Sequence, residues 1–183
     1  MLMNLALYLH LLALLAAVGG SAVSHYLHAR ERRSSTAEEA LGHATMMQSV
    51  ARVFPVASLL LLASGFYMAW RLDLLSTGWI WVAVVGLVLI GVVGDGIVGK
   101  HQKELAQELG GNGMSTKAHA LLESPVGRVA PVTVDTLVLG VVWVMVTEPS
   151  TVESVLTLVV AIVVGVAVPL ALTRRNPAPD VVS

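Results

Sequence analysis

Five long apolar segments constrain this chain more than any other feature. A helix that crosses the hydrocarbon core of a bilayer needs about 20 mostly apolar residues. Only 13% of the 183 residues are charged, so too little polar chain remains to cover five such helices in water. We therefore predict an all-α polytopic membrane bundle with a single domain at 1–175 and a disordered cytoplasmic tail at 176–183. The predicted spans are residues 2–26, 53–72, 79–98, 129–147 and 152–172.

The basic residues indicate the orientation of these spans. If the chain crosses five times, only Arg71 of the 11 basic residues falls on one side. Cytoplasmic loops carry the excess of Lys and Arg, so we expect the N-terminus outside and the C-terminus in the cytoplasm. The first segment has no basic residue before its apolar core, which favours a retained span over a cleaved signal peptide. The residues on the predicted cytoplasmic side are Arg30, Arg32, Arg33, Arg52, Lys100, Lys103, Lys117, Arg128, Arg174 and Arg175.

The sequence also contains an internal repeat. HATMMQSVARVFPV at 43–56 and HALLESPVGRVAPV at 119–132 align their His, Arg and Pro residues at a constant offset. Each copy opens a span that is followed by a short loop and a returning span. We predict one N-terminal helix plus two tandem hairpins, Arg52–Val98 and Arg128–Leu172, related by an axis near the membrane normal. Pro55 and Pro131 are expected in the first turn of their spans, where a missing N–H costs little.

Charged residues at membrane depth are candidates for function. Asp95 and Asp135 share their half of the bilayer with Arg52 and Arg128. One interpretation is an ion-pair network that locks the hairpins together, with Arg52 or Arg128 beside Asp135. The alternative is that Asp135 handles protons or cations. The two arginines either extend to lipid phosphates or face inward and hold an anion, such as a haem propionate or a lipid headgroup.

His10 lies well inside the first span, and the sequence leaves its role open. It suits an axial ligand of haem b, for which Met68 and Met145 in the outer halves of their spans would be the partners. The alternative is a core histidine bonded to a hydroxyl, a carbonyl or water. His25 and His28 follow at the inner end of the same span, three residues apart and on one helix face.

Several classes of chemistry find no support in the sequence. The absence of cysteine excludes disulfides, thiolate metal sites and covalently attached haem. No P-loop, dinucleotide fingerprint or H-E-x-x-H occurs, so no catalytic residue is assigned. The net charge of −1 gives no indication of nucleic-acid binding. S-S-T-A-E-E at 34–39 predicts a capped helix that continues into span two, and ELGGNGMST at 108–116 predicts a flexible break with three loop glycines.

Three short motifs carry a family resemblance over most of the chain. These are Y-L-H-L-L-A-L-L-A-A-V-G-G, R-V-F-P-V-A-S-L-L-L-L-A-S-G-F-Y and M-V-T-E-P. They resemble an uncharacterised bacterial family of multi-span integral membrane proteins. That family is loosely similar to copper-resistance D-type proteins and HemJ-type protoporphyrinogen oxidases. The resemblance implies a helical bundle in a bacterial inner membrane and no settled activity.

Together these features favour a haem- or metal-handling membrane module, with the cofactor unknown and haem b as a candidate. The alternatives are a structural or assembly subunit of a membrane complex and a small transporter that uses Asp135. Beyond the lipid bilayer, a second copy or another membrane protein is an expected partner because small residues allow close helix approach. These residues are Gly19, Gly20, Gly86, Gly91, Gly94, Gly96 and Gly140.

Overall fold

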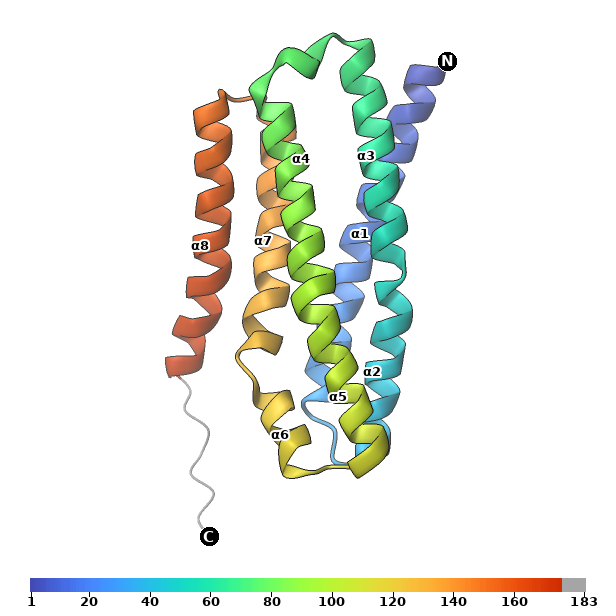
Figure 1. Ribbon diagram of the computed structural model, residues 1–183, viewed down its shortest axis with the longest axis vertical. Helices are drawn as coiled ribbons and strands as arrows, with labels where there is room; N and C mark the ends of the chain where they lie inside the picture. The colour runs from blue at the N-terminus through green and yellow to red at the C-terminus, as the bar shows by residue number, and fades with distance from the viewer. Residues whose placement is uncertain (176–183) are drawn as a thin grey trace.

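The computed structural model describes residues 1–175, and helices account for nearly all of this range, with no β-strand in it (Figure 1). The predicted tail at 176–183 lies outside the described residues. The elements in chain order are α1 (Leu2–Glu31), α2 (Ala37–Ala51), α3 (Val53–Arg71), the 3-10 helix η1 (Leu74–Ser76), α4 (Gly78–Gly91), the π-helix η2 (Val92–Val98), α5 (Gly99–Asn112), α6 (Thr116–Glu123), α7 (Val126–Thr147) and α8 (Thr151–Arg175).

Five helical rods are long and apolar enough to cross a membrane, which confirms the predicted fold class. Their outward faces are apolar: 69% of Leu15 and 76% of Val146 is exposed. Such surface is unfavourable in water and matches lipid tails. The rods are Leu2–Glu31, Ala37–Arg71, Gly78–Asn112, Thr116–Thr147 and Thr151–Leu172.

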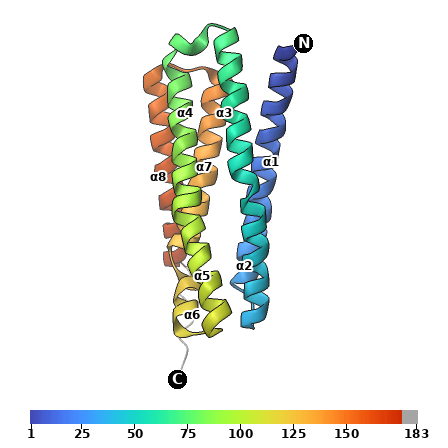
Figure 2. The ribbon, with the colours of Figure 1, turned by 45° about the vertical axis from the view of Figure 1, so that its right-hand side comes forward.

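The rods form two groups within the bundle. α1 packs along α3, whereas α7 packs along α8 and α4 packs against both. Figure 2 shows α1, α2 and α3 on one side and α4, α7 and α8 on the other. The two groups meet most closely at the lower end of Figure 1, where α2 packs against α5. We call this end, which carries α2, α5 and α6, the polar end.

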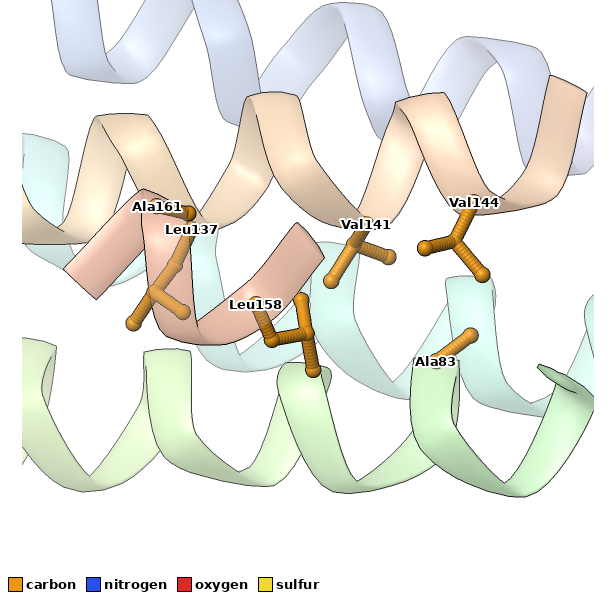
Figure 3. Packing of buried hydrophobic residues seen from close by; sticks show 6 residues of the cluster. All are labelled: Ala83, Leu137, Val141, Val144, Leu158 and Ala161. Carbon is orange, nitrogen blue, oxygen red and sulfur yellow. The ribbon is translucent and has the colours of Figure 1, made fainter. Parts of the chain in front are cut away.

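A small apolar cluster holds α4, α7 and α8 together (Figure 3). Leu137 and Val144 of α7 are 1% and 0% exposed and face Leu158 of α8 and Ala83 of α4. Gly165 of α8 lies so close to α7 that a Cβ there would be 2.6 Å from the Cα of Thr133. Helices in membranes associate through this kind of close van der Waals packing at small residues.

The polar end has an apolar cluster of its own. Ala40 of α2, Leu105 and Leu109 of α5, and Ala118 of α6 are each at most 3% exposed. The predicted capped helix is confirmed as α2: Thr36 Oγ1 accepts a hydrogen bond from Glu39 N at 3.2 Å, and Glu39 Oε2 accepts one from Ser35 N at 3.2 Å. This end is therefore an ordered part of the fold that extends beyond the apolar spans.

The predicted flexible break at 108–116 is mostly wrong. α5 continues through Gly110 and Gly111 to Asn112, and the chain turns only at Gly113, whose φ is 66°. Gly113 is the glycine that the turn requires, because a side chain is strained at positive φ. Leu109, beside the two helical glycines, is buried in the polar-end cluster. Burial of this apolar face offsets the low helix propensity of glycine.

The two hairpins of the predicted repeat share their order of elements. α2 leads into α3 as α6 leads into α7, and His43 and His119 lie in the two leading helices. Their packing differs, because α7 contacts α8 along its length while α3 and α4 contact each other far less. A rotation that relates the hairpins therefore stays a prediction from the sequence.

Candidate functional site

A ladder of polar side chains runs along one face of α1 toward the polar end. Its members are spaced by four, three and three residues, which keeps them on one side of a helix. The ladder covers about 15 Å at 1.5 Å per residue. Most other positions of α1 are apolar, so this face carries its longest run of polar side chains. The residues are Ser21, His25, His28 and Glu31.

Asp135 of α7 is bound by the upper part of this ladder. Ser21 Oγ donates a hydrogen bond to Asp135 Oδ1, and His25 Nε2 is bonded to Asp135 Oδ2. The side chains of His25 and Asp135 are 42% and 33% exposed. The carboxylate therefore has both oxygens bonded to α1 while the pair stays partly open to its surroundings.

The ion-pair network predicted from common depth is not formed. Arg52 lies at the break between α2 and α3, Asp95 lies in η2, and both side chains are exposed. Neither makes a hydrogen bond or ion pair within residues 1–175. Arg128 is half-buried beside Arg32. Similar depth in the membrane therefore did not predict which of these residues contact one another.

A second polar cluster occupies the lower part of the ladder. Gln102 of α5 donates from Nε2 to His28 Nε2 at 3.2 Å and to Glu31 Oε2 at 3.4 Å. Glu31 and Gln102 are only 1% and 4% exposed. Their Oε1 atoms have no hydrogen-bond partner in the described part of the protein. An adjoining cavity of about 10 Å³ is about the size that one water needs.

The start of α7 lies beside this polar cluster. Pro131 is the sixth residue of α7, which begins at Val126, so it lies inside the helix rather than in the predicted first turn. Proline has no N–H for the carbonyl four residues earlier, which is that of Gly127. Arg32 Nη2 donates a hydrogen bond to Gly127 O at 2.9 Å. A side chain from the α1–α2 connection thus replaces the bond that Pro131 cannot make.

His10 lies in the interface between α1 and α3. It is 9% exposed, and its Nδ1 is 3.1 Å from Ser64 Oγ. Ser64 donates its own hydrogen to Leu60 O, so its oxygen accepts from Nδ1–H of His10. Gly65 makes room for the ring, because a Cβ there would be 3.3 Å from His10 Cε1. The bond to a hydroxyl agrees with the core-histidine interpretation and leaves Nε2 as the ring nitrogen for any further group.

The two candidate methionine ligands differ in placement. Met68 is half-buried and follows Ser64 by four residues, which puts both on one face of α3. Met145 is 38% exposed on α7, which belongs to the other group of helices. Among the described residues, no group of three or more His, Cys, Asp or Glu is arranged to hold a metal ion.

Sequence reasoning missed Ser21, Ser64, Glu31 and Gln102 as partners of the candidate histidines. The spacing of Ser21, His25, His28 and Glu31 could have revealed a polar face on α1. No sequence signal connects Ser64 to His10 or Gln102 to Glu31, because those contacts depend on how helices are rotated about their axes. No protein-family description, curated protein or solved structure matches the chain.

Proposed function

We propose that the chain is an inner-membrane protein that takes up and releases protons at the His25–Asp135 pair. The observation that carries this proposal is the identity of the group bonded to Asp135. Arginine is always charged and would hold a carboxylate permanently ionised. Histidine gains and loses a proton in the physiological range, so the pair can change its protonation state.

The lower ladder supports a proton route to the polar end. His28 follows His25 on the same face of α1, and Gln102 bridges His28 to Glu31. These groups can donate and accept hydrogen bonds along a buried path. Ionisable residues at membrane depth mark proton relays and ion pathways. The haem-handling and assembly functions predicted from sequence do not account for this path.

Proton flux into liposomes tests the proposal. The purified full chain is reconstituted in vesicles that contain a pH-sensitive dye, and a pH gradient is imposed. We expect proton movement with the unaltered chain and its loss in Asp135→Asn. Asp95→Asn is the matched control, because the Asp95 side chain makes no bond in the described structure. Equal flux through the unaltered chain and Asp135→Asn would reject the proposal.

The proposed orientation places the polar end in the cytoplasm, in line with the distribution of basic residues. Reporter fusions after Thr77 and Ser150 are then expected to read as external. A fusion at Gly113, in the turn after α5, is expected to read as cytoplasmic. A cytoplasmic signal at Thr77 would require the opposite orientation and reverse the direction of the proton route.

Haem b binding at His10 is a second candidate function. It is favoured by the hydrogen bond from His10 Nδ1 to Ser64, because histidine ligands are usually oriented by a bond at their other nitrogen. Met68 is the better placed of the two methionines. Absorption spectra of the oxidised and dithionite-reduced protein test this candidate. Bands that vanish in His10→Ala would support it, and a protein without haem bands would reject it.

A further inference from the structure

A second feature of the polar end lies outside the proton route. A cavity of about 240 Å³ opens between the α1–α2 connection, α6 and the start of α7. It is smaller than the ~300–1,000 Å³ of pockets that enclose drug-sized ligands. Its size therefore suits a compact headgroup or ion. The polar residues that line it are Arg32, Ser34, His119, Glu123 and Arg128.

The charges of this cavity are unbalanced. Arg32 and Arg128 each contribute a positive charge, and Glu123 is the one carboxylate among the described residues that line it. Within residues 1–175, neither arginine is in an ion pair with a carboxylate. Partial desolvation of the Arg32 guanidinium, and then the charge of Arg128, hold the pKa of Arg32 below its ordinary value, against the opposing effect of Glu31. Two neighbouring cations repel each other, so an anion between them would be stabilised.

The arginines also have hydrogen-bond donors to spare. Arg128 Nε is buried and has no hydrogen-bond partner in the described structure. Arg32 uses Nη2 for Gly127 O, and a guanidinium carries five N–H donors in all. A planar fork of this kind matches two oxygens of one phosphate group. A buried donor without a partner is costly, and an anion that drew the guanidinium of Arg128 into the cavity would give this donor a partner.

We propose that this cavity binds a phosphate group through Arg32 and Arg128. The cavity borders the start of α7, where this rod enters the apolar part of the bundle. The phosphate can therefore belong to a lipid headgroup or to a soluble anion, and the recognition chemistry is the same. The expectation from the sequence was an anion held by Arg52 and Arg128, whereas the structure places Arg32 beside Arg128.

Two measurements on the purified full chain test this proposal and separate the sources. Native mass spectrometry compares how much phosphatidylglycerol and phosphatidylcholine the protein retains in detergent. Thermal unfolding in a zwitterionic detergent then measures stabilisation by inorganic phosphate. We expect Arg128→Gln and Arg32→Gln to weaken the bound anion about tenfold, the size of one lost charge-assisted hydrogen bond. Arg33→Gln is the matched control, because Arg33 is the neighbouring arginine and does not line the cavity.

Each outcome has a definite meaning. Arginine-dependent retention of phosphatidylglycerol alone identifies a lipid headgroup, and arginine-dependent stabilisation by phosphate identifies a soluble anion. Arg128→Gln removes no hydrogen bond of the described structure, so it should retain the helical circular dichroism of the unaltered chain. If both arginine variants bind both probes as well as Arg33→Gln does, the proposal is wrong. Proton flux through the His25–Asp135 pair is measured separately and does not depend on this result.

Discussion

Arg32 Nη2 donates a hydrogen bond to the backbone oxygen of Gly127 at 2.9 Å. This bond connects the α1–α2 connection to the start of α7, which is 95 residues away in the chain. It exists because Pro131 interrupts the hydrogen bonding of α7 one turn after Gly127. Pro131 of α7 therefore leaves the backbone oxygen of Gly127 free to accept a hydrogen bond from Arg32, which follows the end of α1.

This relationship predicts that substitutions of Arg32 and Pro131 have non-additive effects on the free energy of unfolding. Arg32→Met should lower the free energy of unfolding by about 1–3 kcal/mol, because Gly127 O loses its partner. In a Pro131→Ala background, the backbone N–H that the alanine restores can bond Gly127 O, so the same substitution of Arg32 should cost close to nothing. Thermal unfolding in detergent measures the four proteins of this double-mutant cycle. Equal costs in both backgrounds would show that the Pro131 gap is not what Arg32 fills.

The exchange of His25 for arginine separates structure from proton handling. His25→Arg keeps a donor for Asp135 but holds a charge that does not titrate. We expect helical content and thermal stability close to those of the unaltered chain, together with loss of proton flux in liposomes. Ser24→Ala is a control, because the Ser24 hydroxyl donates to Gly20 O within its own helix and does not contact Asp135 in the described structure. Normal flux through His25→Arg would contradict a role for this imidazole.

The His10–Ser64 bond predicts a local stability effect. Ser64→Ala should lower the free energy of unfolding by about 1 kcal/mol, since it removes the hydroxyl that bonds the buried imidazole and leaves only the backbone of Leu61 beside it. In a His10→Phe background the cost should fall, because no polar group remains to be satisfied. Ser49→Ala in α2 serves as the control, because the exposed Ser49 hydroxyl donates to Thr45 O within its own helix. Additive costs would indicate that Ser64 acts independently of His10.

The close approach of α8 to α7 at Gly165 predicts that packing between these helices contributes to stability. Gly165→Ala would place a Cβ 2.6 Å from Thr133 Cα, so α8 must move away or distort. Overpacking of this kind costs about 1–3 kcal/mol, and we expect a lower midpoint of thermal unfolding. Gly91→Ala meets no atom within 4 Å and should leave the midpoint nearly unchanged. Similar midpoints for the two variants would mean that the α7–α8 contact adds little to stability.

The sequence predicted the spans because span length and apolar composition are local properties. α3, α7 and α8 each lie within a few residues of the predicted ranges, α4 and η2 together cover the third range, and α1 continues past its range to Glu31. The Thr36 cap of α2 also follows a local pattern. Which residues contact each other between helices is not a local property. Arg52 or Arg128 was expected near Asp135 by depth, but His25 binds it. When a helix is apolar on every side, its sequence does not reveal which face turns inward. The depth of a residue in the membrane can therefore be predicted from the sequence, whereas the direction of its side chain cannot.

The π-helix η2 was not predicted, and it changes the direction in which the side chains of α5 point. A π-helical turn bonds residue i to i+5, so η2 contains more residues per turn than the helices on either side. Each residue of an α-helix advances the side-chain direction by about 100°. Deleting one residue between Val92 and Val98 would therefore rotate α5 by about that angle relative to α4. Gln102 would then turn away from Glu31 and His28. η2 therefore sets the rotation of α5, at the polar end, relative to the membrane part of the same rod.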